Sequence, residues 1–507
     1  MLGSCKDTVA TPNGNNSNSN VFYSEDFRPQ YHFTPKQNWM NDPNGLVYHN
    51  GEYHLFYQYN PKGNKWGHMS WGHAVSKDLV FWEELPVALE EENGVMIFSG
   101  SVVVDKDNTS GLCANGPCMV AIYTGHEEGK VQHQDIAASQ DNGRTWQKYK
   151  GNPVIDIQKK DFRDPKVFWH QATQKWVMSV ALPDEHKIQL YGSENLINWN
   201  KLSEFGPMGG VDRVWECPDL FPVKVDNERG GYKWVMLVSG PSAHGPEFVG
   251  MQYFMGDFDG QKFTPDSDQY PLYLDYGKDF YAGVTFNNEP YDNRIMIGWM
   301  NNWKYGQALP TSPWKGTMSV PRTLSARKMT DGKYRLIQTP LASLAKLRNQ
   351  TTQFAINNVP IGKKAFLDNN FTQTKSMELN ATIENIGDSG FGFKVFIGDR
   401  EETIIGYDVA KEELFIDRVV SSKKTPFEPS FPSRDAMPYK INQGHVKLHI
   451  FLDQSTIEVF VDDGLRTMSA LAFPTNKETK IQAYAVGGSL RLSPVELWEM
   501  DGIWNRK

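Results

Sequence analysis

A weak internal repeat between about residue 27 and residue 338 restricts the fold of this chain more than any other feature of the sequence. In each copy a short apolar segment ends in a small or acidic residue, a polar turn follows, and an aromatic residue opens the next segment. The copies are Ala74–Trp82, Ala138–Trp146, Gly192–Trp199 and, more faintly, Gly256–Phe263. The aromatic positions lie 64, 53 and 64 residues apart, which suits one four-stranded sheet per interval.

Several such sheets in sequence favour a β-propeller. Strand-like segments such as Tyr53–Tyr59 and Trp234–Ser239 fill the intervals, and a length near 310 residues allows five blades. A run of separate sandwiches is the rival architecture, but the sequence between the copies contains no linker-like stretch. The repeat therefore predicts a five-bladed β-propeller over residues 27–338.

The pattern changes after this repeat. Residues 339–354 are interpreted as a linker with a short helix, in which Thr339 is the N-cap and Pro340 takes the first helical position. From residue 355 to residue 507 the segments are longer, and in His445–Leu452 the apolar residues stand two apart. This alternation predicts a C-terminal β-sandwich and, for the whole chain, an all-β fold.

Within the N-terminal residues 1–26, the stretch 6–20 is rich in Asn and Ser and has only two adjacent apolar residues, Val9 and Ala10, so we expect a flexible tether. Cys5 follows Leu-Gly-Ser, which resembles the end of a bacterial lipoprotein signal, and a chance cysteine in a tag-like segment is the alternative. Cys113 and Cys118 flank a turn and form either a small disulfide or two free thiols. These alternatives stay open at the level of sequence.

The composition narrows the possible functions. The net charge of -8 and the absence of a basic cluster argue against nucleic-acid binding, and no run of eighteen apolar residues is present. The four cysteines form no zinc-binding pattern, and the twelve histidines include no H-E-x-x-H motif. We therefore expect neither a metal nor a cofactor. The fifteen tryptophans suit β-sheet packing and flat surfaces for sugar rings.

Three acidic residues stand near strand starts in separate repeats: Asp42, Asp164 and Glu216. The innermost strands of a propeller converge on its axis, so these side chains can meet there. Each of them could also be a simple turn cap or a structural carboxylate. Glu216 lies between Trp215 and Cys217, and apolar enclosure would raise its pKa, whereas Asp42 lies in a turn rich in N–H donors and should stay ionised. Two carboxyl groups with separated pKa values are typical of glycoside hydrolysis.

Four motifs support this hypothesis together. They are Trp39–Gly45, Phe98–Ser101, Phe162–Pro165 and Trp215–Asp219, and they resemble the signature motifs of glycoside hydrolase family 32, the β-fructosidases. The sequences of these motifs are most similar to those of bacterial levanases. The resemblance covers the chain from about residue 27 to its end and implies a five-bladed propeller followed by a β-sandwich.

The resemblance also implies roles for individual residues. Asp42 would be the nucleophile, Glu216 the acid and base, and Asp164 a transition-state stabiliser oriented by Arg163. Because the family retains configuration, the two reacting carboxyl groups should lie about 5–5.5 Å apart. The implied substrate-binding residues are Asn41, Gln58, Trp66, Phe98, Ser99, Arg163, Asp279 and Trp299. For Trp66 and Trp299, packing between blades is the alternative interpretation.

The implied activity is that of a retaining β-fructofuranosidase that removes terminal fructose from levan or inulin and also cleaves sucrose. A fructosyltransferase, a non-catalytic fructan-binding protein and a propeller glycosidase for arabinose or xylose glycans are the alternatives. Because polymeric substrates do not cross membranes, we expect a secreted or cell-envelope protein, with a lipid on Cys5 as one possible tether. The sequence does not indicate an oligomeric state.

Overall fold

The computed structural model describes residues 22–504 except 115, 269, 351–353, 357–358, 362–364, 367–374, 385–386, 388, 424–426, 442–443, 477–479 and 488–489. Most of the expected tether, with Cys5, lies outside the described residues. Among the described helices, none is long and apolar enough to cross a membrane. They are the 3₁₀ turns η1 (Pro183–Glu185), η2 (Gly306–Ala308) and η3 (Ala342–Leu347).

Five antiparallel sheets follow one another along the first part of the chain. The first contains β1 (Asn38–His49), β2 (Glu52–Asn60), β3 (Ser70–Ser76) and β4 (Trp82–Leu89). The second contains β5 (Met96–Asp105), β6 (Cys118–His126), β7 (Gln132–Ser139) and β8 (Gln147–Lys148), with β9 (Ile155–Lys159) beside β7. The third contains β10 (Arg163–His170), β11 (Lys175–Leu182), β12 (Lys187–Ser193) and β13 (Asn200–Phe205).

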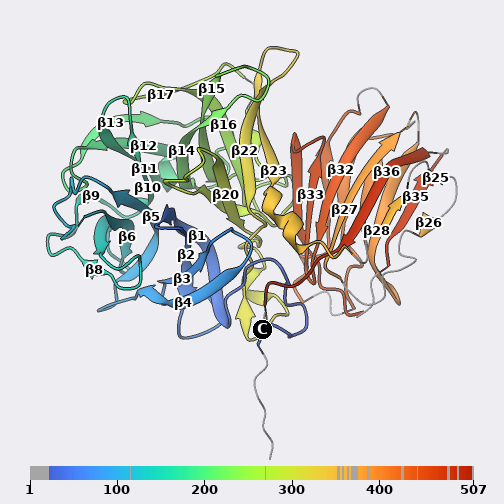
Figure 1. The fold of residues 1–507 in the computed structure, drawn as a ribbon, viewed down its shortest axis with the longest axis horizontal. Coiled ribbons are helices and arrows are strands. Elements are labelled where there is room, and N and C mark those ends of the chain that lie inside the picture. Colours follow the sequence, from blue (N-terminus) through green and yellow to red (C-terminus); the bar gives the residue numbers. More distant parts are fainter. Residues whose placement is uncertain are drawn as a thin grey trace, which may run out of the picture.

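The fourth sheet contains β14 (Glu216–Lys224), β15 (Tyr232–Gly240), β16 (Gly250–Phe258) and β17 (Phe263–Pro265), with β18 (Leu272–Tyr273) beside β16. The fifth contains β19 (Tyr281–Thr285), β20 (Arg294–Trp299), β22 (Arg322–Lys328) and β23 (Tyr334–Pro340). Figure 1 shows the sheets arranged around a ring, from blue β1–β4 to yellow β22 and β23. The first strands of successive sheets contact one another, and β19 contacts β1. β21 (Trp314–Lys315) follows β20 in the chain but pairs with β1, which helps to close the ring.

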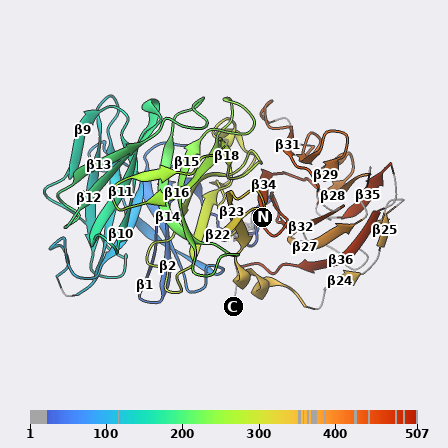
Figure 2. The ribbon, with the colours of Figure 1, turned by 90° about the horizontal axis from the view of Figure 1, so that it is seen from above.

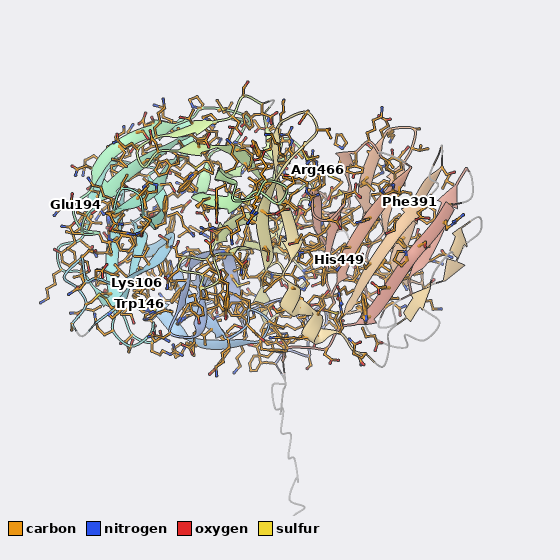
Figure 3. The ribbon with its side chains drawn as sticks, turned by 45° about the horizontal axis from the view of Figure 1, so that its top comes forward. Lys106, Trp146, Glu194, Phe391, His449 and Arg466 are labelled. Carbon is orange, nitrogen blue, oxygen red and sulfur yellow. A yellow bond between two sulfur atoms is a disulfide. The ribbon has the colours of Figure 1, made fainter. Side chains whose placement is uncertain are left out.

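The aromatic residues of the sequence repeat stand at the outermost strand of their sheets. Trp82 and Phe263 open β4 and β17, and Trp146 and Trp199 directly precede β8 and β13. Trp146, labelled in Figure 3, packs edge-on against Phe56 of the first sheet, with ring centroids 5.6 Å apart. The repeat predicted the architecture because each outer strand needs a large apolar anchor between neighbouring sheets.

The C-terminal part is a sandwich of two sheets, and Figure 2 shows it beside the propeller. One sheet contains β24 (Phe354–Ile356), β25 (Val359–Ile361), β27 (Met377–Glu384), β32 (His445–Leu452), β33 (Thr456–Val461), β34 (Arg466–Leu471) and β36 (Leu490–Glu499). The other contains β26 (Ala365–Phe366), β28 (Gly390–Gly398), β29 (Glu401–Asp408), β30 (Glu413–Asp417), β31 (Arg434–Pro438) and β35 (Gln482–Val486). Side chains from both sheets form one buried apolar cluster. The all-β prediction and the alternating strand predicted over His445–Leu452 are confirmed.

Two local expectations have definite outcomes. Cys113 and Cys118 form a disulfide in the loop between β5 and β6, with their Cα atoms 5.4 Å apart. The predicted helix cap at Thr339 is wrong, because Thr339 and Pro340 end strand β23 and pair with β22. The helical turn begins later, at Ala342, and is a 3₁₀ turn without a side-chain cap. Pairing with the neighbouring strand outweighed the local Thr-Pro signal.

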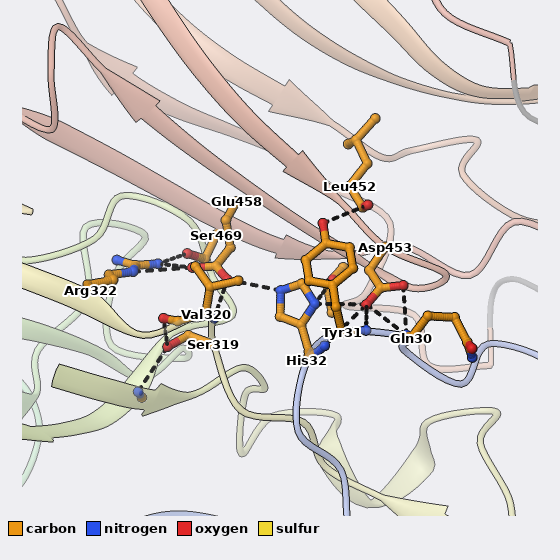
Figure 4. Close-up of polar contacts among 12 residues, drawn as sticks. Gln30, Tyr31, His32, Ser319, Val320, Arg322, Leu452, Asp453, Glu458 and Ser469 are labelled. Carbon is orange, nitrogen blue, oxygen red and sulfur yellow. Dashed lines mark hydrogen bonds and ion pairs between the residues drawn. The ribbon is translucent and has the colours of Figure 1, made fainter. Parts of the chain in front are cut away.

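A buried charged network joins the propeller to the sandwich (Figure 4). His32 contacts Asp453 through Nδ1 and Glu458 through Nε2, at 3.0 Å each. Glu458 also accepts a hydrogen bond of 2.6 Å from Nη2 of Arg322, which lies on β22. Burial alone would lower the pKa of His32, but its two carboxylate partners outweigh burial and raise that pKa to about 9. His32 is therefore a cation at neutral pH and cross-links the two parts of the chain.

Replacing His32 by Gln should destabilise the folded chain at neutral pH. Because the pKa of His32 rises from 6.5 to about 9 on folding, its stabilisation is complete below pH 6.5 and is lost as the pH rises through 9. The shift corresponds to about 3 kcal/mol. Urea unfolding midpoints at pH 6 and pH 10 should differ less in the variant than in the parent chain. The exposed His68→Gln serves as control, and an unchanged pH dependence in His32→Gln would contradict the assignment.

Candidate active site

All five innermost strands contain a register shift near their first residues. The shifts lie between Met40 and Pro43, Ile97 and Gly100, Arg163 and Lys166, Glu216 and Asp219, and Tyr281 and Val284. Such a bulge lets two adjacent residues oppose one partner and turns their side chains away from the regular alternation. Asp164, Cys217 and Ala282 have positive φ angles of 66°, 45° and 53° at these points. The bulges bring side chains from separate sheets together at one end of the axis.

Asp42 lies at the centre of this group and is 9% exposed. The Asn41 amide donates to its Oδ1 at 3.1 Å, and the Ser99 hydroxyl donates to its Oδ2 at 3.0 Å. The Cys217 thiol donates to the same Oδ2 at 3.5 Å. Three innermost strands, β1, β5 and β14, therefore hold one carboxylate in a fixed orientation.

Asp164 shares the Cys217 contact. Its Oδ2 accepts the backbone N–H of Cys217 at 2.9 Å and lies 3.6 Å from the Cys217 sulfur. Since the same sulfur contacts Asp42, the two aspartates lie on either side of one thiol. Cys217 was expected to be an apolar neighbour of Glu216, but the structure instead makes it a donor to the two aspartates.

Glu216 lies in a different environment from the one predicted. Its side chain is 23% exposed, and its Oε1 accepts two hydrogen bonds from Arg163 at 3.0 and 2.8 Å. Tyr281 donates to Oε2 at 2.5 Å. Trp215 turns away and is fully buried between the third and fourth sheets, so it does not enclose Glu216. Arg163 was expected to orient Asp164, and this prediction is wrong because its guanidinium bonds Glu216 and Asp161.

Asp42 was expected to stay ionised because of donors in its turn, and the structure shows that the pKa of its carboxyl group is nevertheless raised. Burial, and then the negative charge of Glu216, raises the pKa of Asp42 to about 6. Burial also raises the pKa of Asp164 to about 7, although the charge of Arg163 opposes this rise. The side chains of Asn41, Ser99 and Cys217 donate to Asp42 and lower its pKa, but desolvation by burial is the larger effect.

The remaining predicted binding residues fall into three settings. Gln58 is buried on β2 and donates to the Ile97 carbonyl at 2.9 Å, so it supports the bulge of β5. Trp66 is 39% exposed and contacts Phe98 edge-on, and Phe98 stacks on His126 with centroids 4.4 Å apart. These three rings form a partly exposed aromatic surface next to Ser99. His126 was missed by sequence reasoning.

Neither Trp299 nor Asp279 has a hydrogen bond to the three carboxylates among the described residues. Trp299 is fully buried and packs against Trp39 and Trp303, as the packing alternative anticipated. Asp279 is fully buried at the junction with the sandwich, where it accepts hydrogen bonds from Arg418 and Tyr305 at 2.5 Å each. Their sequence motifs lie close to the site, but their side chains are used for packing and docking.

Tyr281 is the principal site residue that sequence reasoning missed. It occupies the first position of β19, as Arg163 and Glu216 occupy the first positions of β10 and β14. Aligning the five strand starts by the Pro or Gly that follows them, at positions 43, 100, 165, 218 and 283, would have indicated it. Among the described residues, no group of three or more His, Cys, Asp or Glu side chains is placed to hold a metal ion.

Comparison with known proteins identifies the family of the chain. The model of the glycosyl hydrolases family 32 N-terminal domain matches residues 32–340, and that of the family 32 C-terminal domain matches residues 343–499. The chain belongs to glycoside hydrolase family 32. The levanase of Bacillus subtilis is 46% identical over 95% of this chain and 72% of its own length.

Solved structures of family 32 enzymes share the whole fold. The exo-inulinase of Aspergillus awamori has a TM-score of 0.87 at 36% identity, covering 95% of this chain and 100% of that one. A fructofuranosidase from Schwanniomyces occidentalis, complexed with fructosylnystose, has a TM-score of 0.86 at 34% identity, covering 95% and 99%. The chain is thus a glycoside hydrolase with the family's propeller and sandwich.

Replacing Asp42 by Asn should stabilise the folded chain at alkaline pH. A carboxyl group whose pKa rises from 3.8 to about 6 on folding favours the folded state fully below pH 3.8, and this contribution is lost as the pH rises through 6. Neutral Asn avoids that loss, so the gain should be near zero at pH 4 and about 3 kcal/mol at pH 8. Thermal unfolding midpoints across this range measure it. The exposed Asp156→Asn is the control, and lower stability of Asp42→Asn at pH 8 would refute the burial argument.

Proposed function

We propose that this chain is a retaining β-fructofuranosidase that releases terminal fructose from levan or inulin and hydrolyses sucrose. The observation that supports this most directly is the convergence of Asp42, Asp164 and Glu216 at one end of the propeller axis, in a chain of family 32. Two aspartates share one thiol, and Glu216 is held separately by Arg163 and Tyr281. The site therefore separates a nucleophile from a proton donor.

In the first step, Asp42 attacks the anomeric carbon of the terminal fructosyl unit. The bond from that carbon to the glycosidic oxygen breaks, and the leaving oxygen takes a proton from Glu216. The hydrogen bonds from Asn41 and Ser99 fix the direction in which Asp42 points, so little reorganisation is needed at attack. The product is a covalent fructosyl-enzyme and a free leaving group.

In the second step, water attacks the same carbon and releases Asp42. Glu216 now accepts a proton from the water, and fructose leaves with its original configuration. Arg163 and Tyr281 hold Glu216 through both steps. The expected spacing of about 5–5.5 Å between the reacting carboxyl groups remains a prediction of this mechanism.

Asp164 has the supporting role in this proposal. It is 7% exposed and receives a backbone N–H from Cys217, which leaves its other oxygen for sugar hydroxyls. Its negative charge, placed beside Asp42, would stabilise the positive charge that develops on the sugar ring. The aromatic surface of Trp66, Phe98 and His126 would contact the next sugar unit of the substrate.

We propose a secreted or cell-envelope location for the enzyme. The name of the Aspergillus awamori relative describes an extracellular exo-inulinase. The Cys113–Cys118 disulfide supports an oxidising compartment. Attachment of a lipid to Cys5 would place the enzyme on the cell surface.

The products formed from sucrose, inulin and levan test the function. Chromatography of early time points should show fructose as the only product from inulin and levan, and fructose with glucose from sucrose. Short fructose oligomers would indicate internal cleavage. Products longer than the substrate would indicate a fructosyltransferase, and unchanged substrates would leave only fructan binding.

Asp42→Asn and Glu216→Gln should each lower kcat by at least about 10³-fold, since each removes a group that makes or breaks a bond. The fold should survive, and circular dichroism with unfolding midpoints verifies this. Asp156 is exposed and lies outside the site, so the Asp156→Asn variant should retain full activity. Near-normal turnover by either purified site variant would exclude the assigned roles.

A further inference from the structure

A cavity of about 760 Å³ lies at the far end of the innermost strands from the three carboxylates. It is lined by the last residues of β5 and β10 and by the middle of β14, whereas the three carboxylates stand at or near strand starts. Along β10, His170 stands six positions after Asp164, which corresponds to about 20 Å of strand. The cavity is therefore distinct from the catalytic group. Its volume falls within the range of about 300–1,000 Å³ that is usual for small-molecule sites.

Two buried polar atoms at this cavity have no hydrogen-bond partner among the described residues. Asp219 is fully buried, and its Oδ2 accepts the backbone N–H and hydroxyl of Thr285 at 2.7 and 2.8 Å. Its Oδ1 has no partner, and neither does Nε of Arg294. Both residues line the cavity. An unmade buried hydrogen bond costs about 1–3 kcal/mol, so these atoms indicate a missing donor and a missing acceptor.

The other walls of the cavity supply flat apolar surfaces and few net charges. Trp169, Trp176 and Trp234 all line it. Lys106, labelled in Figure 3, and Arg294 face three acidic lining residues, Asp105, Asp107 and Asp219. Asp105 accepts hydrogen bonds from the Thr109 and Ser110 hydroxyls, and Nζ of Lys166 lies 3.4 Å from Oδ2 of Asp219, so the charges nearly balance. This balance favours neither a strong anion nor a strong cation. A neutral ligand that both donates and accepts hydrogen bonds, and that has faces to lie against indole rings, fits these walls best.

We propose that this cavity is a second carbohydrate-binding site that takes a neutral mono- or disaccharide. One sugar hydroxyl would donate to Oδ1 of Asp219, and another sugar oxygen would accept from Nε of Arg294. The choice of fructose as the sugar rests on the proposed function, whereas the site itself rests on the cavity and its unpartnered atoms. Bound sugar would connect β5, β10 and β14 at the end of the axis opposite to the carboxylates.

Titration calorimetry with fructose on the full-length Asp42→Asn chain tests the proposal, because that variant is expected to be inactive and binding is then measured apart from turnover. We expect two fructose molecules per chain. Adding Ala172→Trp, which places a large side chain at the exposed cavity wall without removing a contact, should reduce this number to one. Arg294→Met, which keeps the apolar stem and removes the donor, should weaken the second site at least about tenfold. Crystals soaked with fructose should show the sugar in both places.

Lys175→Trp is the matched control, since it adds the same side chain three residues further along, outside the cavity lining. It should leave two sites. The proposal would be overturned if the Asp42→Asn chain bound one fructose, and if adding Ala172→Trp to that chain left this number at one. Competition by inorganic phosphate would overturn the carbohydrate assignment in favour of an anion. If the parent chain does not hydrolyse fructans, the proposed function is refuted. The proposed sugar site is not, because its binding is measured in an inactive variant.

Discussion

The register shift at the start of every innermost strand is the constraint on which the site depends. In a regular strand, adjacent side chains point to opposite faces, so one strand could offer only every second residue to the axis. The bulges remove this restriction. Arg163 and Asp164 both reach the site from β10, and Glu216 and Cys217 both reach it from β14. Five short strands thereby supply enough side chains to hold three carboxylates in defined positions.

This convergence has an energetic cost that the rest of the fold offsets. Burial raises the pKa values of Asp42 and Asp164, so their ionised forms are destabilised inside the protein. The junction with the sandwich shows the opposite case. There Asp453 and Glu458 are equally buried, but their cationic partners His32 and Arg322 hold their pKa values below the usual range. The paired carboxylates of the junction support the structure, whereas no cation is hydrogen-bonded to Asp42 or Asp164 among the described residues.

Much of this architecture could be predicted from the sequence, for identifiable reasons. Aromatic anchors such as Trp82 and Trp146 recur because each outer strand packs in the same way, and the alternation in β32 follows from one buried face. The three carboxylates were predicted because each begins or closely follows the start of an innermost strand. The hydrogen-bond partner of Arg163 could not be predicted from the sequence, since it depends on how β10 and β14 approach each other. Asp279 was misassigned because its motif continues into β19, while its own side chain faces the sandwich.

The segment from residue 275 to residue 281 explains how the sandwich contributes to the site without lining it. Asp275 receives hydrogen bonds from Arg322 and from the Ser469 hydroxyl of β34, and Asp279 receives one from Arg418. The chain then enters β19, and Tyr281 donates to Glu216. A displacement of the sandwich would move this segment and with it the Tyr281 hydroxyl. Because that hydroxyl and Arg163 both bond Glu216, contacts with the sandwich help to position this carboxylate.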